Sequence, residues 1–115
     1  MSPRAPNGIE RRAVSRQRTL LRGRVCFGPR HSITVECGIR NLSEHGAQVR
    51  LPPQQPLPGE LTLLYVNEGL AFDASVIWRR GEVVGLRFTG RHNLKGDVSD
   101  DLKSLRAIWS ALAPA

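Results

Sequence analysis

The chain has 115 residues, 40% of them hydrophobic, which is enough for one packed core but not for two. No apolar run approaches the roughly 20 residues of a membrane-spanning helix, and the first residues, Met1 to Pro6, lack the apolar core of a secretory signal. We therefore expect one domain that does not insert into a membrane and resides in the cytoplasm.

Positive charge is concentrated in the first half of the chain. Residues 1–50 contain ten arginines and three acids, a balance of +7, whereas residues 51–115 contain seven groups of each sign. Most of the cations are arginine, the side chain suited to bidentate contacts with phosphate and guanine. This pattern predicts an anionic partner, and a solvated basic face that only aids solubility is the alternative.

Residues 1–16 combine Pro, Gly and Arg without apolar periodicity, so we expect a flexible basic arm that stays disordered until a partner orders it. A β-hairpin follows, with a turn at Gly28–His31. Its inward faces are predicted to carry Leu21, Gly23, Val25 and Phe27 on the first strand and Ile33, Val35, Cys37 and Ile39 on the second. The opposite face is polar, which predicts a hairpin with one solvent-exposed side.

Four more strands are predicted within residues 17–90. They cover Ala47–Leu51, Leu61–Val66, Leu70–Arg79 and Val83–Phe88, and a proline-rich connection at 52–59 separates the first two. Alternation with Val76 predicts a core position for Trp78, and an exposed stacking platform is the alternative. Six short antiparallel strands favour a mainly β fold, a small barrel without exposed edges.

Residues 91–115 are predicted to form a linker and one amphipathic α-helix, lying on the barrel or on a partner. Apolar residues recur there at helical spacing, with Asp97 at the cap position and Asp100 and Asp101 in the first turn. The recurring residues are Val98, Leu102, Leu105, Trp109 and Leu112.

The sequence offers no catalytic or metal-binding constellation. Cys26 and Cys37 have neither metal-ligand spacing nor companions for a disulfide framework, so we expect two buried or half-buried thiols. His31, His45 and His92 also lack metal spacing, and no Ser-His-Asp or Cys-His arrangement is evident. An enzyme, a metal site and a cofactor are therefore not predicted.

Two short polar motifs bracket the first hairpin. Arg12 and Arg16 form an Arg-x-x-x-Arg pair before it, and Asn41, Ser43 and Gly46 form an Asn-x-Ser-x-x-Gly loop after it. Guanidinium groups bind phosphates and guanine edges, the amide and hydroxyl add directional hydrogen bonds, and glycine permits close approach. Each motif alone also fits an ordinary basic segment or turn.

Together with a six-strand pattern that closes on Val84-Gly85-Leu86-Arg87-Phe88, these motifs resemble the PilZ domain from about Glu10 to Phe88. The resemblance implies a six-stranded barrel that binds cyclic di-GMP, with Arg12 and Arg16 on an arm that wraps the ligand. It also implies ligand contacts from Asn41, Ser43 and Gly46. Asn41 stands where the family more often has Asp.

The leading hypothesis is a single-domain cyclic di-GMP receptor or adaptor, whose arm closes on the ligand and changes the surface shown to a protein partner. Arg40, outward on its strand, adds positive field. Arg11 provides a third guanidinium in the arm, which favours two stacked ligands per chain. The alternatives are a basic nucleic-acid-binding barrel, although few exposed aromatic rings are predicted, and a ligand-independent scaffold assembling through the C-terminal helix.

Overall fold

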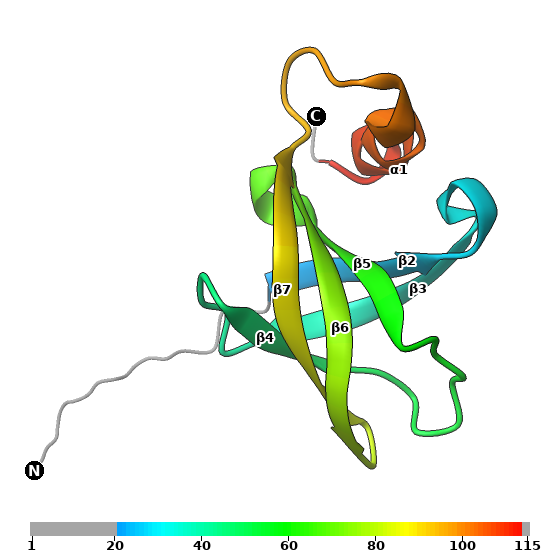
Figure 1. The fold of residues 1–115 in the computed structure, drawn as a ribbon, viewed down its shortest axis with the longest axis vertical. Helices are drawn as coiled ribbons and strands as arrows, with labels where there is room; N and C mark the ends of the chain where they lie inside the picture. Colours follow the sequence, from blue (N-terminus) through cyan, green and yellow to red (C-terminus); the bar gives the residue numbers. More distant parts are fainter. Residues whose placement is uncertain (1–20, 114–115) are drawn as a thin grey trace, which may run out of the picture.

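The computed structural model describes residues 21–113, which form a closed antiparallel barrel (Figure 1). The strands are β2 (Leu21–Phe27), β3 (Ile33–Arg40), β4 (Gly46–Arg50), β5 (Glu60–Tyr65), β6 (Leu70–Arg80) and β7 (Val83–Asn93). Their order around the barrel is β2-β3-β4-β7-β6-β5, which confirms the predicted six-stranded architecture. The predicted arm, residues 1–16, lies outside the described residues, and so do Arg11, Arg12 and Arg16.

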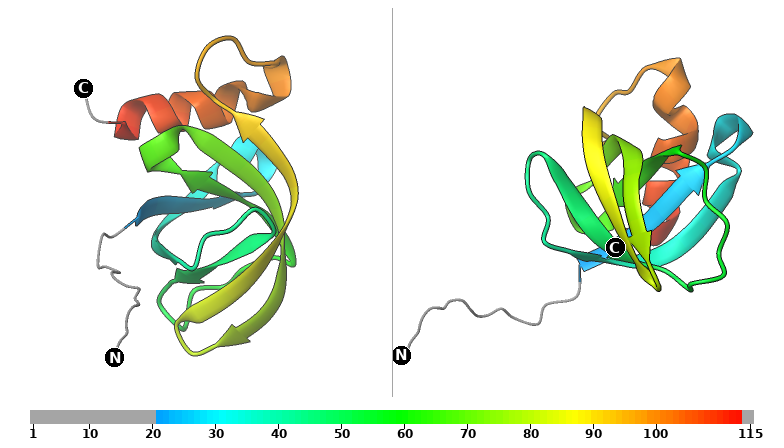
Figure 2. Two further views of the ribbon diagram at one scale, coloured as in Figure 1. Left: turned by 90° about the vertical axis from the view of Figure 1, so that its left-hand side faces the viewer. Right: turned by 60° about the horizontal axis from the view of Figure 1, so that its bottom comes forward.

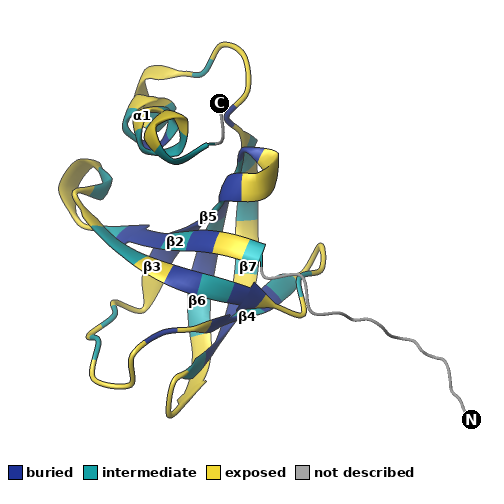
Figure 3. Cartoon of the chain, turned by 180° about the vertical axis from the view of Figure 1, so that it is seen from behind, coloured by how far each residue is buried: buried dark blue, intermediate teal, exposed yellow. Residues whose placement is uncertain are grey.

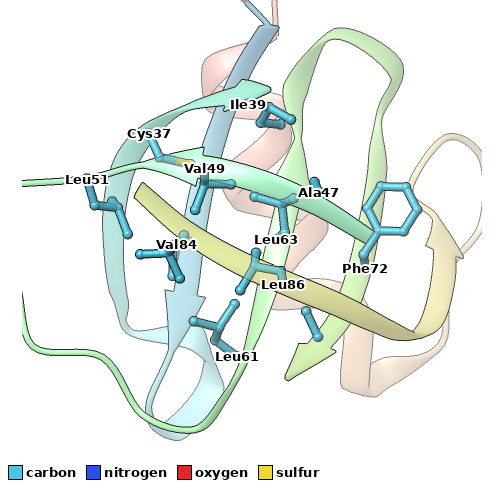
Figure 4. Close-up of a cluster of buried hydrophobic side chains, with 12 residues drawn as sticks. Cys37, Ile39, Ala47, Val49, Leu51, Leu61, Leu63, Phe72, Val84 and Leu86 are labelled. Atoms are coloured by element: carbon cyan, nitrogen blue, oxygen red, sulfur yellow. The ribbon is translucent and has the colours of Figure 1, made fainter. Parts of the chain in front are cut away.

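One face of every strand contributes to the barrel core (Figure 4). Val25, Val49, Leu63 and Val84 are fully buried there. The rings of Phe72 and Phe88 stack with centroids 4.1 Å apart near one end of the barrel. The predicted inward positions of β4 are confirmed, because Ala47, Val49 and Leu51 all belong to this cluster.

Two details of the strands differ from the prediction. Ile33 is 45% exposed rather than inward, because β4 pairs only with Gly38 to Arg40 and leaves the start of β3 outside the closed wall. The last strand continues to Asn93 instead of ending at Phe88. It does so because β6 and β7 shift register between Asp73 and Ala74, where Thr89 forms a bulge without ending the ladder.

A C-terminal helix covers part of the outer wall of the barrel (Figure 2). A 3₁₀ turn, η3 (Asp100–Leu102), leads into α1 (Lys103–Leu112). Ser99 rather than the predicted Asp97 stands at the N-terminal cap of that turn. The helix packs through Leu105, and the indole Nε1 of Trp109 donates a hydrogen bond to the Val66 carbonyl at 2.9 Å. The helix was predicted to lie on the barrel or on a partner, and it lies on the barrel.

The helix creates a second buried cluster on the outer surface of the barrel wall. It contains Cys26, Leu64, Val66, Ala71, Leu94 and Leu105. The prediction of a hairpin with one solvent-exposed face is therefore wrong where Cys26 faces the helix, and Figure 3 shows how buried and exposed residues alternate along β2 and β3. An outward apolar residue in this hairpin is buried because a distant segment covers it.

Both cysteines are buried free thiols, as predicted. Cys26 lies opposite Thr34 and points toward the helix, whereas Cys37 lies opposite Gly23 and points into the barrel. Burial raises the pKa of Cys26 to about 11 and that of Cys37 to about 12. Among residues 21–113, no helix is long and apolar enough to cross a membrane.

Candidate functional site

The loop joining β3 to β4 carries the Asn-x-Ser-x-x-Gly motif at one end of the barrel. Asn41 has a φ of 51°, in the left-handed region that asparagine adopts more readily than most residues. Its Nδ2 donates a hydrogen bond to Oε1 of Gln48 on β4, 3.1 Å away. The backbone thus gives a local reason for Asn at this position, and its amide reaches the outer face of the sheet.

The hydroxyl of Ser43 holds the loop closed. Its Oγ accepts hydrogen bonds from the N–H groups of His45 at 3.2 Å and Gly46 at 3.3 Å, and donates to the Gly46 carbonyl at 3.3 Å. The Ser43 N–H donates to the same carbonyl at 2.9 Å. A hydroxyl offers one donor and two acceptor positions, so all are engaged within the loop. The loop is preformed, and a ligand contact by Ser43 Oγ requires one of these bonds to exchange.

Gly46 is required by the neighbouring strand. It lies opposite Arg87 where β4 begins, and a Cβ at this position would collide with the backbone carbonyl of Leu86. Its φ is not in the left-handed region. The motif glycine is therefore explained by the close approach of β4 to β7, which sets the end of the loop beside β7.

Outward residues of four neighbouring strands line up in one row beside this loop. Arg40 of β3 lies opposite Gln48 of β4. Gln48 lies opposite Gly85 of β7, which in turn lies opposite Trp78 of β6. We call these four residues the outer row. Because adjacent strands are about 4.8 Å apart, the outer row spans about 14 Å. It offers a guanidinium at one end, an indole at the other, and an amide between them.

Trp78 lies outside the barrel, and its predicted core position is wrong. Val76 pairs with Leu86 while Trp78 pairs with Gly85, so two steps along β6 match one step along β7 and Ile77 forms a bulge. Residues beyond a bulge change face. The indole is 39% exposed and covers Gly85, where a Cβ would collide with it.

Arginines give this face a positive field. Arg87 of β7 lies opposite Gly46 of β4, and Arg50 lies two residues after Gln48 on β4. Arg50 pairs with Glu82 at 2.9 Å, and because both side chains are about half exposed the pair adds little stability. Arg40 and Arg87 are exposed beside the loop. The face is suited to a flat ligand that carries negative charge.

Two histidines, His31 and His92, make polar contacts with neighbouring elements and not with the 41–46 loop. His31 Nδ1 is 2.9 Å from Ser104 Oγ of α1, and His92 Nε2 is 2.9 Å from Asp73 Oδ2. These contacts connect the helix and the last two strands to their neighbours. In the part of the chain that the structure describes, no three metal-ligating side chains converge.

Four predicted binding residues lie together at one end of the barrel: Arg40, Asn41, Ser43 and Gly46. The other three, Arg11, Arg12 and Arg16, lie outside the described residues.

Three residues of this surface, Gln48, Arg87 and Trp78, were not among the predicted binding residues. The sequence could have indicated Gln48 and Arg87 as surface residues, because each alternates with buried residues of its strand and therefore faces outward. Trp78 was an alternative stacking platform but was assigned to the core, because nothing in the neighbouring sequence marks the bulge at Ile77.

Comparison with known proteins gives one family. The sequence profile of the PilZ domain matches residues 10–96, which is most of the chain. No curated protein and no solved structure matches it. The profile covers the arm motif, the Asn41–Gly46 loop and all six strands of the barrel. The chain therefore belongs to the PilZ domain family.

Proposed function

We propose that this chain binds cyclic di-GMP on the outer row, beside the 41–46 loop, and that Arg12 and Arg16 complete the site. The PilZ domain is a family of cyclic di-GMP receptors that act as binding or adaptor domains. The observation that carries the proposal is the outer row itself. It places a guanidinium, an amide and an exposed indole on one face next to a preformed polar loop.

The chemistry of the ligand matches this face. Cyclic di-GMP has two flat guanines and two phosphates, so it needs stacking surfaces, directional hydrogen bonds and cations. The Trp78 indole is a stacking surface, and the Asn41 amide can both donate to and accept from a guanine edge. Arg40 and Arg87 are exposed beside the loop, and their guanidinium groups can pair with the phosphates.

Arg12 and Arg16 supply guanidinium groups from outside the barrel. A guanidinium can fork onto guanine O6 and N7, pair with a phosphate, or stack flat on a purine. When the N-terminal segment closes over the ligand, it changes the surface presented to a protein partner. The chain thus acts as a single-domain receptor, and the closed form is its signalling state.

Calorimetric titration of the full chain with cyclic di-GMP tests this function. We expect a dissociation constant in the micromolar range or tighter, a free energy of about −8 kcal/mol or better. GMP serves as the control, because it has one guanine and lacks the second base and the macrocycle. Titration of folded protein to ligand saturation without a heat change would end the proposal.

Single-stranded nucleic acid is the second candidate, favoured by the exposed Trp78 ring among arginines. The two candidates differ in salt dependence. Binding driven mainly by phosphates weakens steeply between low and physiological salt, whereas guanine contacts keep cyclic di-GMP binding less sensitive. Titrations with a single-stranded oligonucleotide and with cyclic di-GMP at both salt concentrations separate the two. More salt-resistant binding of the oligonucleotide favours the nucleic-acid function.

A further inference from the structure

A residue outside the motif holds the side-chain amide of Asn41 in one orientation. Nδ2 of Asn41 donates to Oε1 of Gln48, 3.1 Å away, and Gln48 is half-buried on β4 whereas Asn41 is exposed. At a φ of 51° the chain turns out of β3, and the Asn41 side chain reaches across to β4. Within residues 21–113, Oδ1 of Asn41 has no hydrogen-bond partner. The sheet thus engages the nitrogen of this amide and leaves its oxygen for a ligand.

Arg40 favours this orientation of the two amides. It lies opposite Gln48 on the outer face, and its guanidinium offers only hydrogen-bond donors. A cation that only donates attracts the oxygen of the Gln48 amide and not its NH₂ group. Oε1 has two lone pairs, enough for Nδ2 of Asn41 and for a guanidinium N–H. The charge beside Gln48 therefore favours the arrangement in which Asn41 donates and Gln48 accepts.

We infer that Gln48 makes Asn41 select guanine over adenine, an inference that rests on the proposed function. A free asparagine amide pairs with adenine through both of its ends, because it accepts from the 6-amino group while it donates to a ring nitrogen. With Nδ2 held by Gln48, Asn41 instead presents Oδ1, an acceptor. Guanine offers two adjacent donors, N1–H and the 2-amino group, to such an oxygen. Gln48 is accordingly a positioning residue that gives an uncharged side chain the accepting behaviour of a carboxylate.

Paired titrations of the full chain with cyclic di-GMP and cyclic di-AMP measure the selectivity, which is the ratio of the two dissociation constants. The two ligands share the sugar-phosphate ring and differ only in the base. We expect the parent to prefer cyclic di-GMP at least about tenfold. Gln48→Leu cannot accept a hydrogen bond and should lower this ratio at least about fivefold, the effect of roughly one hydrogen bond.

Two further variants separate the accepting oxygen from other properties of Gln48. Gln48→Glu restores an acceptor and should keep most of the parent's selectivity, although its charge repels the phosphates and weakens binding of both ligands. Gln54→Leu makes the same change from amide to aliphatic side chain at an exposed position in the proline-rich connection. It is the matched control and should retain the selectivity of the parent. Thermal denaturation of each variant establishes that folded protein is titrated.

A double-variant cycle tests the contact between the two side chains. Asn41→Asp alone should keep the preference for guanine, because the Gln48 amide can turn its Nε2 toward the carboxylate and donate to it. Asn41→Asp combined with Gln48→Glu brings two carboxylates to hydrogen-bonding distance, where they repel each other. We expect the combined variant to bind cyclic di-GMP at least about fivefold more weakly than the product of the single effects. Independent effects of the two substitutions would contradict the inference.

Nuclear Overhauser effects in the ligand-free chain test the amide orientation without a ligand. The cross-peak between the Nδ2 protons of Asn41 and the γ protons of Gln48 should exceed that between the Nε2 protons of Gln48 and the β protons of Asn41. The reverse order overturns the inference alone. So does a parent that binds both ligands equally, a Gln48→Leu variant that loses both to the same degree or keeps the parent ratio, or a loss of selectivity in Gln48→Glu. A parent that binds neither ligand overturns the proposed function with it.

Discussion

The two outer faces of this barrel arise from the same strand alternation, but one is buried under the C-terminal helix and the other is open to solvent. On β2, β5 and β6 the outward residues include Cys26, Leu64 and Ala71, each 0% exposed because α1 and its linker cover them. On β3, β4 and β7, which form what we call the open face, the outward residues include Arg40 and Arg87, which are exposed, and Gln48, which is half-buried and accepts a hydrogen bond from Asn41. An outward position on a strand therefore does not predict exposure to solvent. Apolar outward residues are buried by another segment of the chain, whereas polar outward residues are available to bind a ligand.

Glycines mark the open face. Gly38, Gly46 and Gly85 occupy outward positions of their strands on this face, and they differ in which atoms surround them. A Cβ would meet the Leu86 carbonyl at Gly46 and the Trp78 indole at Gly85, whereas it would meet nothing within 4 Å at Gly38. The open face is thus shaped by close contacts as well as by charge.

The largest expected effect concerns the covered face. Leu64→Ala removes a fully buried side chain beneath α1 and should lower the free energy of unfolding by about 2–5 kcal/mol. Gln48→Ala, the matched change on the open face, should alter it by no more than about 0.5 kcal/mol. Urea denaturation of both variants measures the difference. Equal losses would mean that the two faces contribute alike to stability.

Arg12→Ala and Arg16→Ala test what completes the open face. Each should weaken cyclic di-GMP binding by about 10- to 100-fold, the loss expected when a hydrogen bond to a charged group is removed. The melting temperature of the ligand-free chain should stay near that of the parent, because we assign these side chains to the ligand rather than to the core. Calorimetry and thermal denaturation are measured on the same samples. A clear fall in melting temperature would show that the arginines stabilise the fold.

Gly46→Ala sharpens the comparison among glycines. Its methyl group collides with the β7 backbone, and we expect a loss of about 1–3 kcal/mol in the free energy of unfolding. Gly38→Ala is the matched control on the adjacent strand, where a methyl group has open space, and it should not destabilise the fold. If both variants unfold at the same urea concentration as the parent, the approach of β4 to β7 is not what requires Gly46.

The sequence predicted most of the fold because the strands alternate regularly and the breakers are local. It failed where distant contacts decide. Strict alternation placed Trp78 inside, and only the pairing of β6 with β7 reveals the bulge at Ile77 that turns it out. Likewise, the opposite face of the first hairpin was expected to be exposed to solvent, and the burial of Cys26 on that face depends on a helix near the other end of the chain.

The candidate site was predictable to the extent that it is a motif. Asn41, Ser43 and Gly46 stand out by residue type, and alternation alone could have added Gln48 and Arg87. The roles of the motif residues were less accessible. That Ser43 closes its own loop, and that Gly46 faces the Leu86 carbonyl, depend on backbone geometry that spacing does not encode.

Trp78→Ala removes the indole from the open face. Base–aromatic stacking is worth about 1–3 kcal/mol, so cyclic di-GMP binding should weaken by roughly 5- to 150-fold. Ile77→Ala, next to it and 53% exposed, is the control for loss of apolar surface at the bulge and should bind as the parent does. Equal affinity of the two variants would remove Trp78 from the site and leave the ligand to the loop and the arginines.

The smallest expected effect is a change in stoichiometry rather than in affinity. Two cyclic di-GMP molecules can interleave into a stacked pair with four phosphates, which needs more cationic contact than one ligand does. Arg11 adds a third guanidinium to Arg12 and Arg16, and it can lie flat on the outer guanine of such a pair. We therefore propose two ligands per chain, with Arg40 and Arg87 supporting the inner one from the open face.

Calorimetry at a protein concentration well above the dissociation constant gives the equivalence point directly. We expect two ligands for the parent chain and a shift toward one for Arg11→Leu, because leucine cannot supply the charge or the planar contact of a guanidinium. Arg18→Leu, which also removes one positive charge from the N-terminal segment, should keep the parent value. A parent equivalence point of one rules out the stacked pair. Two ligands in both the parent and Arg11→Leu would mean that Arg11 is not the residue that holds the second ligand.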